Sequence, residues 1–167
     1  MGWLWEWIEG FGALVGLATG MYVLIERLTK HYPTALFVPK PLGDFGRQIV
    51  YLRVHNPSDR PILVRLRNGS TNGEFRPAED HSTRAIVSAA LPGETWLPLL
   101  SKDTVDLPLL KPPNYEDMDD ESEIIATLYW RFAQPAFWRG ERRIVASIKR
   151  ASYRRLSKDE LEHWEVD

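Results

Sequence analysis

The hydrophobic and polar positions follow two different periods along the chain. Residues 8–28 read IEGFGALVGLATGMYVLIERL, and no charge occurs between residues 10 and 25. After Lys30, apolar residues instead alternate with polar ones in short runs, which is the period of strands with one buried face. The pattern predicts one helix within residues 1–30 and a β-rich domain in residues 31–167.

The apolar stretch has the length and composition of a membrane-spanning helix. With its interfacial flanks it reaches about 20 residues, and at about 1.5 Å per residue such a helix crosses a hydrocarbon layer of about 30 Å. Trp3, Trp5 and Trp7 precede it, as expected at a membrane–water interface. A signal peptide would begin with basic residues, and a surface amphipathic helix would have a wide polar face. We therefore predict a single span in a lipid bilayer.

Basic residues flank this predicted span on one side only. No Lys or Arg precedes it, whereas Arg27, Lys30 and Lys40 follow it. Basic residues near a span tend to stay in the cytoplasm. We expect a single-pass protein of the cell (inner) membrane, with its N-terminus outside and its C-terminal domain cytoplasmic.

Three glycines recur at intervals of four residues within the span. Gly12, Gly16 and Gly20 fall on one helix face, where the absence of side chains lets a second backbone approach closely. Glu9 precedes them on the same face and belongs to the headgroup zone or to a cation-attracting vestibule. The spacing predicts a homo-oligomer held together through this glycine seam.

The remainder of the chain predicts short strands separated by turns. Two hairpins are expected, one between residues 47–55 and 61–68 and one between residues 122–132 and 141–150. The strand at 122–132 is apolar on both faces and is therefore predicted to be central. Further strands are expected at residues 35–38, 82–89, 94–100 and 105–110.

Two other segments complete this prediction. The acidic residues 114–123 cannot bury themselves and predict an exposed loop. Ser157 and Glu160 form a capping-box pattern, which predicts a short C-terminal helix over residues 157–166. The fold class expected is a single transmembrane α-helix followed by an all-β antiparallel sandwich. The spacing of its short strands and turns resembles that of immunoglobulin-like sandwiches, although the chain lacks the cysteine pair of those domains.

The composition excludes several kinds of chemistry. There is no cysteine, so disulfides, thiolate zinc sites and cysteine nucleophiles are ruled out. Four scattered histidines have no metal-ligand spacing, and no catalytic or nucleotide-binding motif occurs. The net charge of -2 gives no general attraction to duplex nucleic acid. We expect a protein that is not an enzyme and that has no metal or cofactor.

The clearest candidate for ligand binding is a basic segment near the C-terminus. Guanidinium groups beside aromatic rings suit phosphates and stacked bases, although a solvated strand face or contact with anionic lipid would use the same residues. The segment consists of Trp138, Arg139, Arg142, Arg143, Lys149, Arg150, Arg154 and Arg155.

Three functions fit these features. The first is a membrane-anchored, homo-oligomeric binding or scaffold module that recruits a cytoplasmic protein partner. The second is a ligand-gated membrane effector, as in antiviral defence, whose β-domain senses an anionic ligand such as a nucleotide second messenger. A small channel or transporter subunit without its own sensor is a third hypothesis.

Overall fold

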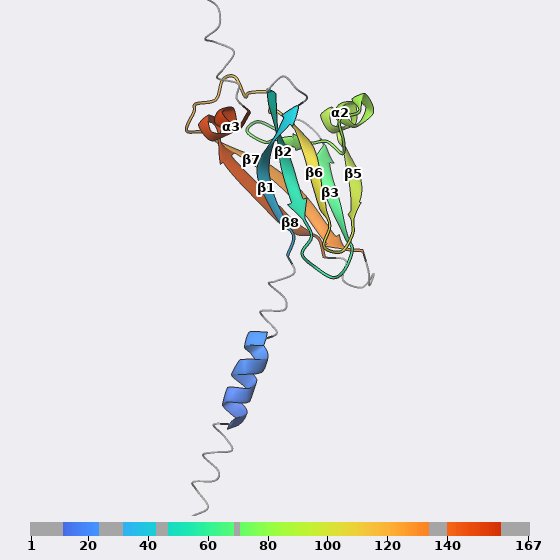
Figure 1. Ribbon diagram of the computed structural model, residues 1–167, viewed down its shortest axis with the longest axis vertical. Helices are drawn as coiled ribbons and strands as arrows, with labels where there is room; N and C mark the ends of the chain where they lie inside the picture. The colour runs from blue at the N-terminus through green and yellow to red at the C-terminus, as the bar shows by residue number, and fades with distance from the viewer. Residues whose placement is uncertain (1–11, 24–31, 43–46, 69–70, 134–139, 158–167) are drawn as a thin grey trace, which may run out of the picture. The chain divides into compact units, whose positions relative to one another are not determined.

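The structure is a computed structural model that describes residues 12–23, 32–42, 47–68, 71–133 and 140–157 (Figure 1). The chain divides into two compact units, Met1–Tyr32 and Pro33–Asp167. In the first unit, residues 12–23 form an α-helix. No helix within the described ranges is long and apolar enough to cross a membrane.

The described part of the second unit forms two four-stranded antiparallel sheets. Sheet 1 has the strand order β1-β2-β6-β4, and sheet 2 has the order β5-β3-β7-β8. The strands are β1 (Thr34–Leu42), β2 (Arg47–His55), β3 (Ile62–Asn68), β4 (Arg76–Pro77), β5 (Gly93–Leu99), β6 (Thr104–Leu110), β7 (Glu123–Phe132) and β8 (Arg142–Lys149). Two helices accompany them, α2 (Thr83–Ala90) and α3 (Arg150–Ser157).

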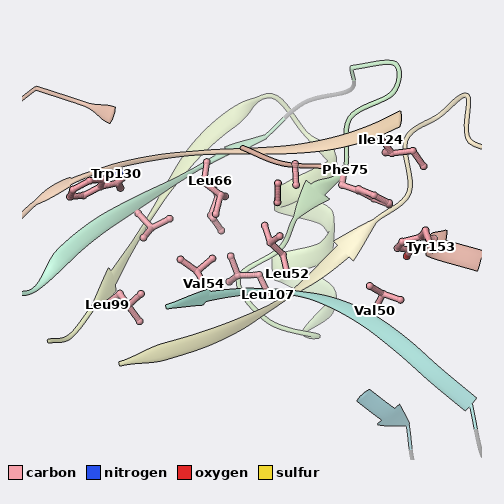
Figure 2. Packing of buried hydrophobic residues seen from close by; sticks show 14 of the residues in the cluster. Val50, Leu52, Val54, Leu66, Phe75, Leu99, Leu107, Ile124, Trp130 and Tyr153 are labelled. Carbon is pink, nitrogen blue, oxygen red and sulfur yellow. The ribbon is translucent and has the colours of Figure 1, made fainter. Parts of the chain in front are cut away.

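The core lies between the two sheets (Figure 2). Leu52 and Leu107 enter it from sheet 1, and Leu66, Leu128 and Trp130 enter it from sheet 2, each at most 1% exposed. These residues alternate with polar positions along their strands, so the period-two pattern determines which face of each strand is buried. The predicted antiparallel β-rich architecture is confirmed.

The predicted hairpin near the C-terminus is also confirmed. β7 pairs with β8 in antiparallel register from Glu123↔Lys149 to Trp130↔Arg142. On its other side β7 pairs with β3, so it is an interior strand, as its apolar residues on both faces predicted.

The other predicted hairpin is wrong, because β2 and β3 belong to different sheets. β2 pairs with β1 and β6, whereas β3 pairs with β5 and β7. The buried Asn56 directs the crossing: its Nδ2 donates to the carbonyls of Arg60 (2.9 Å) and Leu100 (2.8 Å), and its Oδ1 accepts from the amide of Ser58 (3.1 Å). A local turn signal cannot distinguish such a crossing from a hairpin.

The strand predicted at residues 82–89 is a helix instead. Ser82 is the N-cap of α2 and its side chain accepts a hydrogen bond from the amide of Ala85 (3.1 Å). The carboxylate of Asp80 in turn accepts from the amide of Ser82 (2.7 Å). This capping and the alanines outweigh the short apolar alternation.

The remaining predictions need smaller adjustments. The first strand continues through Pro39 and Pro41, which an edge strand tolerates. The short C-terminal helix is present, but α3 ends at Ser157, where a helix was expected to begin. Residues 158–166 of that expected helix lie outside the described residues. The acidic segment is an irregular, largely exposed loop, as predicted.

Candidate functional site

The predicted glycine seam falls partly within the described helix. Gly12, Gly16 and Gly20 each have open space where a side chain would be, with nothing within 4 Å of an ideal Cβ. Every residue from 12 to 23 is exposed. The hydroxyl of Thr19 donates a hydrogen bond to the carbonyl of Val15 (2.8 Å) in the preceding turn. Glu9, the fourth seam residue, lies outside the described residues.

The predicted basic segment is divided by the fold into two groups. Arg142 and Arg143 begin β8, with Arg142 half-buried at 5.5 Å from the ring of Trp130 and Arg143 exposed on the opposite face. Trp138 and Arg139 lie outside the described residues.

The second basic group lies at the junction of β8 and α3 and is engaged by the acidic loop. Lys149 pairs with Glu121 (2.5 Å), and Arg154 pairs with Asp120 (3.0 Å). The Glu121 carboxylate raises the pKa of Lys149. Arg155, on the same helix, is exposed. These paired cations are less available to an external anion than their sequence suggests.

Arg150 anchors the acidic loop from within. Its side chain is 14% exposed, and its Nη atoms donate to the carbonyls of Met118 and Glu116. Its guanidinium lies 5.1 Å from the ring of Tyr115, a buried member of the core. Arg150 therefore supports the loop structurally.

A row of aromatic and cationic residues crosses the outer face of sheet 2. The strand registers place Trp96, Arg65, Tyr129 and Arg143 side by side on β5, β3, β7 and β8. The Arg65 guanidinium carbon lies 4.7 Å from the Tyr129 ring and 5.8 Å from the Trp96 ring. Arg131 lies 4.5 Å from the Trp96 ring. This aromatic–cationic row spans about 14 Å, given the usual strand spacing.

The charges along the row are only partly balanced. Arg65, whose side chain is 20% exposed, is paired with Glu94 (2.6 Å) and Glu141 (2.6 Å). Arg143, at the β8 end of the row, is exposed and has no carboxylate partner within the described part of the chain. The row can therefore attract carboxylate or phosphate oxygens. Base stacking is less favoured because guanidinium groups already lie over the rings.

The outer face of sheet 1 carries a separate charge cluster. Arg53 donates to both carboxylate oxygens of Asp106 (2.7 and 3.0 Å), and Lys40 forms an ion pair with the same carboxylate. The hydrogen bond from Arg53 lowers the pKa of Asp106 to about 2, with Lys40 adding to the effect against desolvation. The cluster fixes β1, β2 and β6 together.

A tyrosine–histidine pair lies on the same outer face. The hydroxyl of Tyr51 is 2.5 Å from Nε2 of His81, and the Lys40 ammonium lies 5.4 Å from the Tyr51 ring. The contact is exposed. In the described ranges, no group of three His, Cys, Asp or Glu residues could hold a metal ion.

Sequence reasoning missed the row because its members are far apart in the chain. Outward-facing Arg65 and Arg67 in β3 and Tyr129 in β7 were visible as alternating positions. Their alignment depends on the β3–β7 pairing, whereas the sequence favoured pairing of residues 61–68 with 47–55. Comparisons with protein-family models, with curated proteins and with solved structures gave no match.

Proposed function

We propose that this chain is a non-enzymatic, membrane-anchored binding or scaffold module. A single span within residues 1–30 anchors it in the cell (inner) membrane, and residues 31–167 form a cytoplasmic β-sandwich that recruits a protein partner. Glycine-seam contacts make the anchor homo-oligomeric.

One observation carries the proposal: the described helix is apolar and wholly exposed. Leu14, Leu17 and Met21 are 67%, 71% and 55% exposed, and the exposed residues surround the helix on all sides. A helix that is hydrophobic all round requires an apolar environment, either protein or lipid. The sequence is uncharged from residue 10 to residue 25, and with its flanks this apolar stretch reaches about 20 residues, the length that a bilayer requires.

The strand order supports an immunoglobulin-like form of the sandwich. With β1, β2, β3, β6, β7 and β8 taken as strands A, B, C, E, F and G, the pairs are A–B, B–E, C–F and F–G. Immunoglobulin sandwiches have these neighbours. Their loops gather at the two ends of the sandwich and their sheet faces remain available, which suits a binding module.

The test is membrane extraction of the full chain. We expect the protein to float with vesicles and to resist alkaline extraction. Leu17→Lys should release a large fraction, since Lys at the centre of a span costs about 2.5–3.5 kcal/mol. Leu36→Lys is the matched control, because Leu36 is also exposed (50%) but lies on β1. Equal release of both variants, or a wild-type protein that stays in solution, would refute the anchor.

A second candidate is a ligand-gated membrane effector. The observation that favours it is the aromatic–cationic row, in which Arg143 has no carboxylate partner among the described residues. An anionic ligand such as a nucleotide second messenger would bind there by charge, and rearrangement of the glycine seam would open or disrupt the membrane.

The effector hypothesis predicts membrane leakage, which the scaffold hypothesis does not. Induced expression should cause dye leakage that needs residues 1–30, and Arg143→Glu should reduce both nucleotide retention and leakage. Asp117→Asn, in the acidic loop, is the control. Unchanged retention in the charge-reversed variant would remove this candidate and leave the scaffold module.

A further inference from the structure

β8 is an edge strand of sheet 2 whose backbone is open to further pairing. The other edge strands in the described part of the chain contain proline, which cannot donate a backbone hydrogen bond. Pro39 and Pro41 lie in β1, Pro77 lies in the two-residue β4, and Pro98 lies in β5. β8 has eight residues and contains neither proline nor glycine. Its whole length can therefore pair with another strand.

The ladder between β7 and β8 shows which backbone groups of β8 are left over. In an antiparallel pair, alternate residues bond to the partner strand, and the residues between them direct their N–H and C=O groups away from it. The amide of Arg150 donates to the carbonyl of Ser122 (2.9 Å), one step beyond the Glu123↔Lys149 pair. Even-numbered residues of β8 therefore bond to β7. The odd-numbered residues direct their backbone groups to the open side, and these are Arg143, Val145, Ser147 and Lys149.

No segment within the described ranges pairs with this open side, which we call the β8 edge. The backbones of its four odd-numbered residues form no hydrogen bond there, and all four residues are exposed. β1 of sheet 1 contacts β8 but pairs with β2 alone. The edge therefore presents a row of alternating N–H and C=O groups, and another extended backbone is the partner that matches such a row.

The side chains of β8 define the chemistry of a strand that would fit there. Arg143 and Lys149 are the outer-face residues at its two ends, and Val145 lies between them with 43% of its surface exposed. On the core side, Ile144 and Ile148 are only half-buried. A strand with carboxylates opposite the two cations and apolar side chains opposite the isoleucines would be complementary on both faces.

We propose that the β8 edge binds an extended segment of a protein partner by strand addition, with acidic residues facing Arg143 and Lys149. The inference rests on the proposed function, because it assigns the surface through which the binding module recruits its partner. In strand addition, main-chain hydrogen bonds give affinity and alternate side chains give specificity. The segment lies antiparallel to β8 as a fifth strand of sheet 2.

A second copy of the chain or a lipid surface fits this edge less well. β8 contains three cations and no acidic residue, so two paired β8 strands would bring like charges within one strand spacing, about 4.8 Å. An anionic lipid surface would attract Arg143 but has no row of backbone donors and acceptors. An acidic strand satisfies the charges and the backbone together.

The first experiment tests the hydrogen bonds with a labelled peptide and the full-length protein. The peptide has valine at every second position, glutamate at both ends and threonine at the two remaining positions, so that its glutamates face Arg143 and Lys149. Fluorescence anisotropy should show binding. N-methylation of the glutamate and threonine amides, which face β8 in the antiparallel register, should abolish binding, whereas N-methylation of the valine amides should preserve it.

Variants of β8 give the second test. Val145→Pro removes one N–H that points away from β7, so the β7–β8 hydrogen bonds remain, and the peptide dissociation constant should rise about tenfold. Val145→Thr is the matched control, because it keeps the N–H and a β-branched side chain. Arg143→Glu should weaken binding about fivefold, and a peptide with lysine in place of the facing glutamate should restore it. The N-methylated peptides use the natural chain, so they are independent of any effect of Val145→Pro on folding.

Three results would overturn the inference. The first is no peptide binding, or equal binding of the two N-methylated peptides, which would leave charge attraction alone. The second is self-association of the full chain that Val145→Pro abolishes, since that would assign the edge to a second copy. The third is an Arg143→Glu variant that loses binding to anionic vesicles but keeps its affinity for the peptide, which would assign this cation to lipid.

The same measurements separate this inference from the proposed anchor. A chain that floats with vesicles but binds no peptide would refute strand addition and keep the anchor. A chain that binds the peptide through β8 but stays in solution would refute the anchor and keep strand addition.

Discussion

At the scale of single residues, arginines with the same chemistry have different roles because they differ in burial and in the residues that they contact. Arg150 is largely buried under the acidic loop, Arg65 lies between two aromatic rings and two carboxylates, and Arg143 is exposed. The sequence identified Arg143 and Arg150 as equivalent members of one basic segment. Their difference arises from contacts with residues more than ten positions away, which composition and spacing do not encode.

The Asp106 cluster gives the clearest dependence of stability on pH. Folding lowers the pKa of Asp106 from 3.8 to about 2, chiefly through the hydrogen bond from Arg53. This contribution is fully present above pH 3.8 and is lost as the pH falls from there to about 2. Asp106→Asn should therefore lower the free energy of unfolding by about 1–2 kcal/mol near neutral pH.

Urea unfolding at a series of pH values checks this expectation. The stabilities of Asp106→Asn and wild type should converge as the pH approaches 2. Asp117→Asn, at an exposed carboxylate without an ion-pair partner in the described ranges, should stay within about 0.5 kcal/mol of wild type throughout. A gap between Asp106→Asn and wild type that is independent of pH would contradict the ion-pair explanation.

At the scale of helices and strands, local pattern predicted most of the elements. Alternation placed the strand at residues 47–55 and the final hairpin correctly, because a buried face forces a period of two. The alternation gave a wrong prediction at α2, where the Ser82 N-cap favours a helix. It also gave a wrong pairing of β2 with β3, because the buried Asn56 contacts segments that only the tertiary fold brings together. The aromatic–cationic row was missed for the same reason, since register is a property of pairs of strands.

The attachment of α3 to the acidic loop predicts a local change in structure. Besides the side-chain contacts of Arg150, its amide donates to Ser122 O (2.9 Å) and the amide of Ala151 donates to Asp120 O (3.0 Å). Arg150→Ala should lower the free energy of unfolding by about 2–3 kcal/mol, because the loop carbonyls lose a charged donor in a mostly buried site. Cleavage by a Glu-specific protease at Glu116 and Glu121 should become faster.

Arg155→Ala is the matched control on the same helix, because Arg155 is exposed. It should leave both the unfolding curve and the cleavage pattern unchanged. Equal effects of the two substitutions would mean that the loop is held by general charge attraction, not by the specific contacts of Arg150.

At the scale of the whole molecule, the chain consists of two units that differ in how their apolar residues are buried. The β-rich unit buries its own core, whereas the described helix has no residue buried. The proposed single span with a cytoplasmic sandwich would account for this contrast, and the flanking charges Arg27, Lys30 and Lys40 predict the orientation. The sequence thus predicts both the division of the chain and the direction of insertion, while the identity of the partner depends on surface geometry.

The orientation can be measured because the chain contains no cysteine. Ser101 is an exposed turn residue of the β-rich unit, so Ser101→Cys should react with a membrane-impermeant maleimide only after spheroplasts are lysed. Gly2→Cys, before the span, should react in intact spheroplasts. Labelling of both variants only after lysis would contradict a span, and the reverse pattern would place the sandwich outside. The predicted pattern requires that Trp3, Trp5 and Trp7 lie at the outer interface and that the basic flank remains in the cytoplasm.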